Sequence, residues 1–434
     1  MNSIKNAPLV PITELLEDII DNRGKSCPTQ NTGFPLIATN CIKHSSIYPT
    51  FENIRYVSDD VLRTWFRAEL KPKDILFVNK GTPGRVCLVP DPITFCAAQD
   101  MIGLRANPNK VYYKYLFAIL RSNYIQEKIK NFHVGIAIPH FKKSDMDNLL
   151  IPVPEMSLQI KIGEIYCQIS ERIENNNKIN LELESMAKTI YDYWFLQFEF
   201  PNVDGKPYKS SGGKMVWNEE LKREIPEGWE IDTIGKHINI DRGISYSSDD
   251  LEDVGIPLIN LSSFNIDATY KPEGLKTYSG TYSKEKVISP FDLVICVTQQ
   301  TAIDLVGDTD VIGKTFLVPD IFETKDIVAS MDVIKIQSDD TYGKYYLNRL
   351  INTKFFHKYI SGFATGTKIK HLDIKGLLNY KCETPNEQAL KKFNDLMECC
   401  EKKKSKIFAE NQELTALRDF LLPLLMNGQV GFKD

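Results

Sequence analysis

The sequence lacks several features by which whole classes of protein are recognised. No stretch approaches the roughly 20 consecutive apolar residues of a membrane span, and the first twenty residues turn acidic too soon for a secretory signal. The nine cysteines are odd in number, have no regular spacing and include no Cys-x-x-Cys pair, which argues against a disulfide framework and a structural zinc site. We therefore expect a reduced, cytoplasmic protein that binds no metal and no membrane.

The motifs of nucleotide binding and methyl transfer are absent as well. Residues 312–315 read IGKT, but the preceding glycine, Gly307, is one residue too distant for a phosphate-binding P-loop. A methyltransferase acting on adenine would need an Asn/Asp-Pro-Pro-aromatic pocket and a glycine-rich cofactor loop, and neither occurs. Asp74 and Asp292 precede expected strands, where a capping or turn role is favoured over metal binding. No nucleophile–histidine–acid set stands out, so we predict that the chain is not an enzyme.

No strong net charge marks the chain, because 53 Lys and Arg nearly balance 57 Asp and Glu. The average conceals differences between segments. Residues 1–154 hold 19 basic and 14 acidic residues, whereas residues 226–385 hold 17 and 23. Each segment nevertheless contains a basic run, at residues 110–143 and 341–375, with seven Lys or Arg and one acid apiece. This recurrence favours contact with nucleic-acid phosphates over solvated helix faces.

The same two segments align with each other, which indicates an internal repeat. A Gly-x4-His pattern followed by a proline occurs in both, as Gly135, His140 and Pro154 and again as Gly366, His371 and Pro385. Further matching pairs are residues 21–26 with 240–245, 34–42 with 256–264, 70–80 with 288–298, 96–105 with 328–337, and 113–120 with 343–350. The order is kept while the offset rises from 219 to about 231. The second copy therefore carries an insertion, most simply near residues 246–255 and 299–313.

Each copy combines apolar runs of strand length with helix-like runs, and a long helical pattern follows it. We predict an α+β fold in which two repeated α/β globules are separated by two long helices that form an antiparallel coiled coil. The expected parts are a first globule at residues 1–154, a helix at 155–200, a connector at 201–225, a second globule at 226–385 and a helix at 386–434. The connector contains DGKPYKSSGGK (204–214), whose composition is typical of a flexible linker that reverses the chain.

Both helical patterns carry an apolar seam with spacings of three and four residues, which alternate throughout the first helix. In the first helix the seam positions are 162, 165, 169, 172, 176, 179, 183, 186, 190 and 193, and in the second they are 390, 393, 397, 400, 404, 407, 411, 414, 417 and 421. Asn176, Lys404 and Asn411 interrupt these seams. Either they fix the alignment of the helices, since a buried polar group is satisfied in only one register, or they lie just off the seam.

Three stretches of the chain resemble the specificity (S) subunits of type I restriction–modification systems. Residues 194–230, WFLQFEFPNVDGKPYKSSGGKMVWNEELKREIPEGWE, are similar to the central conserved region of that family. Residues 411–430, NQELTALRDFLLPLLMNGQV, are similar to its distal conserved region, and GTPGRV (81–86) resembles a turn of its first recognition domain. The second globule departs from the pattern, because residues 298–315 replace the compact turn.

The resemblance implies that each globule is a target-recognition domain that reads one half of a bipartite, asymmetric sequence in double-stranded DNA, and that the helices set the spacing. It also implies a prokaryotic complex with modification subunits, two in number, that bind S-adenosylmethionine, and with ATP- and Mg-dependent restriction subunits that join the assembled methyltransferase. The S subunit itself holds no cofactor and performs no chemistry. A coiled-coil adaptor that binds only proteins and a stand-alone DNA-modifying enzyme are the alternatives.

Base reading requires donors and acceptors on loops, with Arg or Lys suited to guanine and Asn or Gln suited to adenine. The residues predicted to contact DNA are Asn79, Lys80, Thr82, Arg85, His140, Lys142 and Lys143 in the first copy, and Thr298, Gln299, Gln300, Thr365, Thr367, Lys368, Lys370 and His371 in the second. Turns at Gly135 and Gly366 would let the backbone approach a phosphate. For the two histidines the alternative is a capping or core role, and for Gly81 and Gly84 it is a simple strand turn.

Partner binding is predicted at exposed faces of both helices and at the aromatic end of the first one. The residues concerned are Tyr191, Tyr193, Trp194 and Phe195. Large aromatic side chains are frequent anchors in protein interfaces. The alternative is that they pack the helix onto its own globule.

Overall fold

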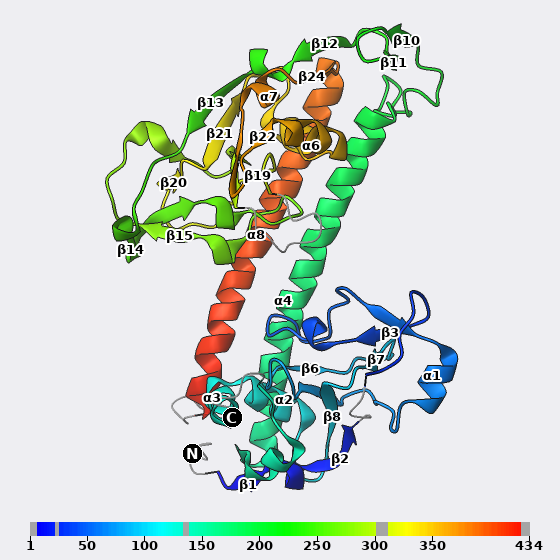
Figure 1. Cartoon of the computed structure of the whole chain (residues 1–434), viewed down its shortest axis with the longest axis vertical. Coiled ribbons are helices and arrows are strands. Elements are labelled where there is room, and N and C mark those ends of the chain that lie inside the picture. The colour runs from blue at the N-terminus through cyan, green and yellow to red at the C-terminus, as the bar shows by residue number, and fades with distance from the viewer. Residues whose placement is uncertain (1–6, 22–25, 133–138, 301–310, 427–434) are drawn as a thin grey trace. The chain divides into compact units, whose positions relative to one another are not determined.

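The computed structural model describes residues 7–21, 26–132, 139–300 and 311–426 (Figure 1). The chain divides into two compact units, one formed by residues 1–178 with 410–434 and the other by residues 179–409. Two long helices, α4 (Met156–Tyr191) and α8 (Glu387–Met426), contribute to both units. None of the helices in the described ranges has both the length and the apolar character needed to cross a membrane.

The first unit is built on a four-stranded antiparallel sheet. Its strand order is β2 (Leu16–Asp21), β8 (Met101–Ala106), β5 (Ile75–Val78) and β6 (Val86–Leu88). All four side chains of β5 are buried, as an unbroken apolar run in a central strand predicts. Beside this sheet, β3 (Phe34–Ile37) pairs antiparallel with β4 (Arg55–Val57) and parallel with β7 (Cys96–Ala97), while β1 (Leu9–Pro11) pairs with β9 (Leu150–Pro152).

The helices of the first unit are α1 (Asp59–Thr64), α2 (Tyr113–Arg121) and α3 (Asn123–Asn131). Seven of the nine side chains of α2 are buried, and the hydroxyl of Tyr115 donates a hydrogen bond to the Pro152 carbonyl at 2.6 Å. Ser122 ends α2 and caps α3 by accepting a hydrogen bond from the Ile125 amide. The core of this unit includes Tyr166 of α4 and Leu422 of α8, so both long helices are part of it.

The second unit repeats this topology. Its antiparallel sheet has the order β13 (Ile238–Arg242), β21 (Val333–Ser338), β17 (Leu293–Cys296) and β19 (Thr315–Leu317). A second sheet has the order β15 (Lys276–Tyr278), β14 (Leu251–Ile259), β20 (Ile327–Ala329) and β16 (Val287–Ile288), and β12 (Glu230–Thr233) pairs with β24 (Lys381–Thr384). The parallel pairing of β14 with β20 matches that of β3 with β7. The helices are α5 (Lys344–Ile351), α6 (Lys354–Ile360) and α7 (Lys375–Leu378). The predicted repeat of two α+β globules is therefore confirmed.

Within each unit the two long helices pack against each other in antiparallel directions. In the first unit Asn176 Nδ2 donates to Asn411 Oδ1 at 2.9 Å, so a middle position of α4 meets a late position of α8. In the second unit Lys404 Nζ donates to Glu184 Oε2 at 2.7 Å, so a later position of α4 meets an earlier one of α8. Asn176, Lys404 and Asn411, the three seam residues predicted to fix the alignment, thus find polar partners on the opposite helix.

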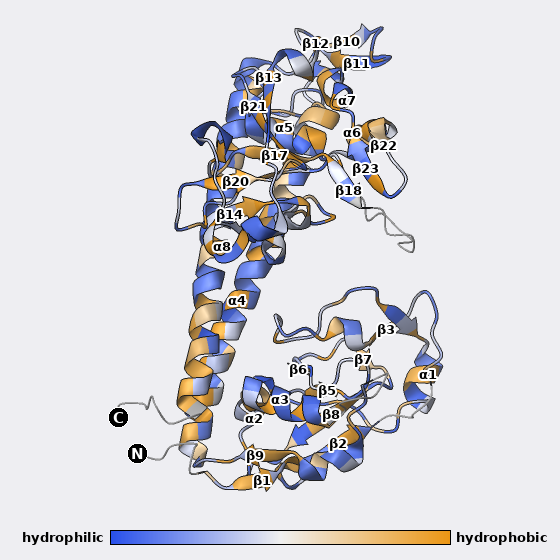
Figure 2. Cartoon of the chain, turned by 60° about the vertical axis from the view of Figure 1, so that its left-hand side comes forward, coloured by the Kyte–Doolittle hydropathy of each residue, from blue (hydrophilic) through white to orange (hydrophobic). Residues whose placement is uncertain are grey.

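The predicted heptad seam of α4 is wrong for one of its two sets of positions. Residues 172, 179, 186 and 193, which are spaced by seven, are all exposed, whereas Ile173, Ala187 and Tyr191 are buried. A helix with 3.6 residues per turn drifts by about 20° per heptad relative to a strict 3.5 repeat. The buried side therefore moves around α4, and in α8 it passes from the predicted Leu417, which is exposed, to Leu422. Figure 2 shows apolar and hydrophilic residues alternating along both helices.

The connector is a packed loop, which corrects the prediction of a flexible linker. The ring of Tyr208 stacks on Phe200 with centroids 4.6 Å apart, and Phe200 stacks in turn on Trp229 at 5.2 Å. A Cβ atom at Gly213 would lie 2.5 Å from the Tyr208 ring, so this glycine is needed for close packing and gives no flexibility. The hairpin of β10 (Met215–Asn218) and β11 (Arg223–Pro226) completes the segment.

A buried charge cluster joins three helices of the second unit. The guanidinium of Arg349 in α5 contacts Glu184 of α4 and Glu401 of α8, with the Glu401 contact at 3.1 Å. Lys404 Nζ lies 2.7 Å from Glu184 and 2.9 Å from Glu401. Burial alone would raise the pKa of Glu184, but the charges and hydrogen bonds of Arg349 and Lys404 outweigh it and lower that pKa to about 2. The cluster therefore stabilises the packing of the globule on both helices.

Replacement of Glu184 by glutamine is expected to destabilise the second unit at neutral pH by about 3 kcal/mol, because it leaves buried cations undercompensated. The matched control is Asp192→Asn, which removes the i,i+4 partner of the exposed Lys188 and should cost less than about 0.5 kcal/mol. Urea denaturation of the two variants and the parent chain measures both effects. Because the folded-state pKa of Glu184 is depressed, its contribution is present above pH 4.5 and is lost as the pH falls towards 2, so the Glu184→Gln effect should shrink over that range. Equal unfolding free energies for the two variants at pH 7 would contradict this.

Candidate nucleic-acid interface

In the first unit the end of a central strand meets the histidine of the Gly-x4-His pattern. Lys80, just beyond β5, forms an antiparallel bridge with His140. The Phe141 amide donates to the Asn79 carbonyl at 2.8 Å, and the Gly81 amide donates to the Pro139 carbonyl at 3.0 Å. Predicted DNA contacts that are 60 residues apart in the sequence therefore lie side by side. The turn predicted at Gly135 lies outside the described residues.

The second unit contains the same arrangement at the end of β17. Strand β18 (Thr298–Gln300) pairs antiparallel with β23 (Ile369–Leu372), which also pairs with β22 (Ala364–Thr365). His371 is the partner of both Thr298 and Thr365, and the Oγ1 atom of Thr298 lies 3.4 Å from Nδ1 of His371. Since Lys80 and Thr298 hold corresponding places after β5 and β17, the pairing of this strand end with a histidine is part of the repeat.

Most of the predicted DNA contacts lie on the surface of their unit. In the first unit Lys80, Thr82, Lys142 and Lys143 are exposed, while Arg85 and His140 are half-buried. In the second unit Thr365, Thr367, Lys368 and His371 are exposed, and Lys370 is half-buried. Gly366 has φ +128°, and a Cβ there would lie 1.9 Å from the Ile369 carbonyl oxygen. Only glycine fits this turn, which links β22 to β23 and presents the polar residues between them.

Two of the predicted base readers are structural, which corrects that part of the prediction. Thr298 and Gln299 are 7% and 8% exposed. The side-chain carbonyl of Gln299 accepts hydrogen bonds from the backbone amides of Val311 at 2.9 Å and Ile312 at 3.2 Å. This acceptor therefore holds the chain downstream and is not available to a base. The side chain of Gln300 lies outside the described residues, and Asn79 is half-buried with its Oδ1 atom unpaired among them.

The aromatic residues predicted to bind a partner are mostly part of their own globule. Tyr191 and Phe195 are buried, and the Phe195 ring lies 5.0 Å from Phe393 and 4.9 Å from Tyr346. Trp194, in the π-helical turn Asp192–Leu196 that follows α4, packs against the same core. For Tyr191 and Phe195 burial removes the surface that a partner would need, as the alternative stated, whereas Trp194 is half-buried and keeps part of its surface. Tyr193 is 39% exposed and keeps such a surface.

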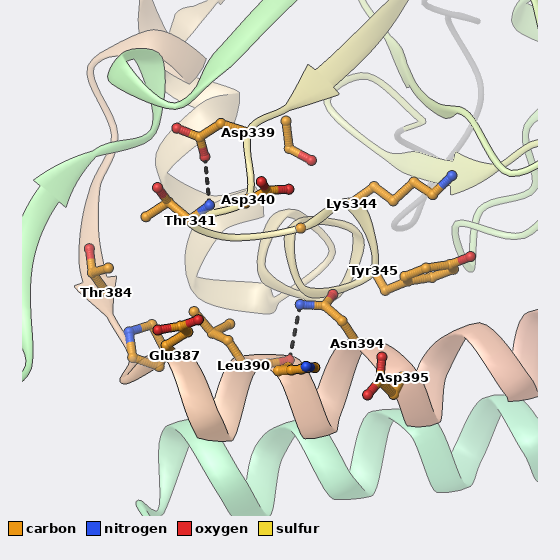
Figure 3. A pocket seen from close by; sticks show the side chains of 14 residues that line it. Asp339, Asp340, Thr341, Lys344, Tyr345, Thr384, Glu387, Leu390, Asn394 and Asp395 are labelled. Carbon is orange, nitrogen blue, oxygen red and sulfur yellow. Dashed lines mark hydrogen bonds between the residues drawn. The ribbon is translucent and has the colours of Figure 1, made fainter.

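A polar pocket of about 850 Å³ lies in the second unit, where the start of α5 approaches the start of α8 (Figure 3). Asp339 accepts a hydrogen bond from the Thr341 amide at 2.9 Å, and Asn394 Nδ2 donates to the Leu390 carbonyl at 3.0 Å. Four acidic residues and two lysines line this pocket. The excess of negative charge makes it unsuited to DNA phosphates. Among the residues described, no group of three or more His, Cys, Asp and Glu side chains could hold a metal ion.

The structure also brings together basic residues that the sequence did not single out. His44, Arg121 and Arg418 line one pocket in the first unit, at the junction of α2 and α3. Partial burial, together with the charges of Arg121, Arg85 and Arg418, lowers the pKa of His44 to about 4. These residues come from three distant segments, and no local motif links them. Spacing in the sequence gave no signal by which this cluster could have been found.

The chain is similar in sequence to known proteins along most of its length. The family described as type I restriction modification DNA specificity domain matches residues 16–185. Over 362 residues the chain is 24% identical to the type I restriction enzyme MjaIX specificity subunit of Methanocaldococcus jannaschii, covering 83% of this chain and 78% of that protein. Over 419 residues it is 22% identical to the HindI specificity subunit of Haemophilus influenzae, covering 83% and 87%.

The fold is similar to that of a solved S subunit of a type I restriction–modification system from M. genitalium, with a TM-score of 0.59, 17% identity and full coverage of both chains. The sequence matches extend over most of the chain, and the matched domain includes the first interface described above. Both of these relatives are named specificity subunits of type I restriction enzymes. Residues 16–185 thus match the type I restriction modification DNA specificity domain, and most of the chain is similar to specificity subunits of type I restriction enzymes.

Proposed function

We propose that each of the two globules reads one half of a bipartite DNA target on behalf of a type I restriction–modification complex. The observation that carries this proposal is the duplicated surface in which a strand end pairs with the segment of His140 in one unit and of His371 in the other. Two matching surfaces on one chain suit a target with two separate half-sites. The two surfaces carry different residues around their paired histidines, which suits half-sites of different sequence.

The exposed residues of these surfaces divide into two chemical roles. Lys80, Lys142 and Lys143 are point charges that suit backbone phosphates, which supply affinity and position without reading sequence. Thr367 and His371 at the β22–β23 hairpin, and the half-buried Arg85 in the first unit, have the donors and acceptors that distinguish base edges. Specificity on this proposal depends on few side chains, each held by a pairing or turn that its own unit supplies.

The long helices are proposed to set the distance between the half-sites. α4 is one continuous helix of 36 residues that contributes to both units. At about 1.5 Å per residue it is about 54 Å long, which corresponds to about 16 base pairs at about 3.4 Å each. A rigid element of this length supports readers placed more than one DNA turn apart.

The chemistry is proposed to reside in partner chains. Two modification subunits would supply S-adenosylmethionine, and restriction subunits with ATP and Mg would join the assembled methyltransferase, while this chain holds no cofactor. The DNA target implies a cytoplasmic, prokaryotic complex. A docking surface for a modification subunit is proposed at an exposed apolar stripe in the second unit, formed by Ile179 and Met186 of α4 and by Tyr193 of the π-helical turn that follows it. Their spacing of seven residues places them on one side of the helix.

Replacement of both Lys142 and Lys143 by glutamine should weaken DNA binding by a similar factor for target and non-target duplexes. The plot of log affinity against log salt should become shallower by about two units, because each phosphate contact contributes about 0.9. Fluorescence anisotropy on the complex with modification subunits measures this slope. The control replaces Lys206 and Lys209, which are exposed on the connector, and should leave the slope unchanged. Equal losses in both variants would remove the proposed contact, and no salt-dependent binding at all would favour a protein adaptor.

Lengthening the helices should change the spacing of the target without changing its half-sites. Seven residues of matched helical sequence added after Lys178 in α4 and after Ala409 in α8 add about 10.5 Å, or about three base pairs. Methylome sequencing of cells that carry the whole system reads the new gap directly. Seven Gly and Ser residues inserted after Ser211 in the connector serve as control and should leave the gap unchanged. If the helix variant recognised half-sites of changed sequence, the globules would not read DNA independently of the helices, and the proposal would be wrong.

Substitution of Met186 by glutamate should reduce co-purification of the modification subunit several-fold, since it places a charge in the apolar stripe. Leu181→Glu is the matched control, because Leu181 is also exposed but lies on the opposite side of α4. Both variants should keep the thermal midpoint of the parent chain. Loss of association in the Leu181 variant alone would place the interface elsewhere.

A further inference from the structure

A pocket of about 340 Å³ in the first unit has an unusual charge balance. It lies where α2 ends and α3 begins, and α4 and α8 supply its other walls. Its lining includes Arg121, Lys130 and Arg418 but only one acid, Asp419. Asp419 is already paired with Arg418, whose Nε donates to it at 2.9 Å, and its side chain is 62% exposed. Lys130 pairs with Glu127 outside the lining, Nζ to Oε1 at 2.6 Å. The positive charge of the pocket that has no acidic partner is therefore that of Arg121.

Arg121 is the most unusual member of this group. The residue is only 8% exposed, yet none of the described carboxylates forms an ion pair with it. Its guanidinium lies over the Phe117 ring at 5.1 Å, and Nη2 makes one long hydrogen bond, of 3.5 Å, to the Lys43 carbonyl. Nη1 is buried with no hydrogen-bond partner. A buried cation without an anion is costly, and such a group calls for an explanation.

The second unit shows how such an arginine is normally accommodated. Arg349 of α5 is equally buried, but Glu184 of α4 and Glu401 of α8 both pair with it. In the first unit the same two long helices offer Arg121 the phenol of Tyr166 and a second arginine, Arg418. The first unit thus lacks the anion that the second unit builds into its own chain.

The remaining walls of the pocket also favour an anion. The first residues of α3 line it, and amide groups at the start of a helix carry partial positive charge. Gln126 of α3 lines the pocket and donates through Nε2 to the Gly84 carbonyl at 2.8 Å. That hydrogen bond joins the pocket to the loop that carries Thr82 and Arg85, which are predicted DNA contacts.

We propose that this pocket binds a phosphate group, with Arg121 as its buried anchor and Lys130 and the start of α3 around it. The planar guanidinium presents paired donors that match phosphate oxygens. The phosphate could belong to the DNA backbone or to a small phosphate compound in solution. The assignment to the DNA backbone rests on the proposed function, whereas the existence of a phosphate site does not.

Inorganic phosphate titrated into the full chain tests the site without DNA. The thermal midpoint should rise with phosphate and should not rise with chloride at matched ionic strength. Arg121→Met should abolish the phosphate response, and its midpoint in phosphate-free buffer should equal or exceed that of the parent chain, since an apolar side chain replaces an uncompensated buried charge. Arg63→Met, at an exposed arginine of α1 in the same unit, is the control and should respond as the parent does. No phosphate-specific shift in the parent, or an equal shift in the Arg121 variant, overturns the proposal.

A second variant covers the case in which Arg121→Met fails to fold. Lys130 is exposed at the rim of the pocket, so Lys130→Gln should fold normally and weaken phosphate binding several-fold in isothermal titration calorimetry. Unchanged affinity in that variant counts against the site. The source of the phosphate is read from DNA binding by the assembled complex. If the Arg121 or Lys130 variant gives a slope of log affinity against log salt that is shallower by about one, the phosphate is that of the DNA backbone. If the slope is unchanged while the parent chain still binds inorganic phosphate, the ligand is a free phosphate compound.

Discussion

The antiparallel pairing of α4 and α8 is the interaction on which the rest of the structure depends. In each unit the globule packs against both helices, so that neither core is complete without them. Polar groups make this pairing specific. Asn176 meets Asn411 in the first unit, and Arg349, Glu184, Glu401 and Lys404 form a closed charge cluster in the second. If one helix shifted along the other by one turn, these groups would be buried without partners. That shift would cost more free energy than the same shift between two wholly apolar seams.

The candidate DNA surfaces follow from the strand order of the repeated sheet. β5 and β17 are central, fully buried strands, so the residues just beyond them emerge at a fixed place on each globule. Segments that lie 60 or more residues later return to the same place and pair with them through backbone hydrogen bonds. The backbone framework is therefore common to both units, whereas the side chains it presents differ. This separation lets one scaffold support two different recognition surfaces.

The repeat, the α+β fold and the two long helices were predictable because each leaves a periodic or duplicated signal in the sequence. The seam of α4 was predicted only in part, since a 3.5-residue repeat does not describe a helix whose buried side follows a globule. The connector was mistaken for a flexible linker because its glycines and serines are visible in the sequence, while the stacking of Tyr208 on Phe200 is not. Gln299 has the chemistry of a base reader, and only the fold shows that its acceptor serves backbone amides 12 and 13 residues downstream.

The division of the chain into units has a consequence for the order of synthesis. Residues 179–409 form one uninterrupted unit, whereas the other unit needs both the beginning of the chain and residues after 410. Leu422 and Leu425 complete a core whose remaining members precede them by more than 250 residues. On the ribosome the second unit can finish folding while the first still exposes the apolar side of α4 near Ile162 and Tyr166. Residues after 410 therefore complete a unit whose other residues were translated before the whole of the second unit.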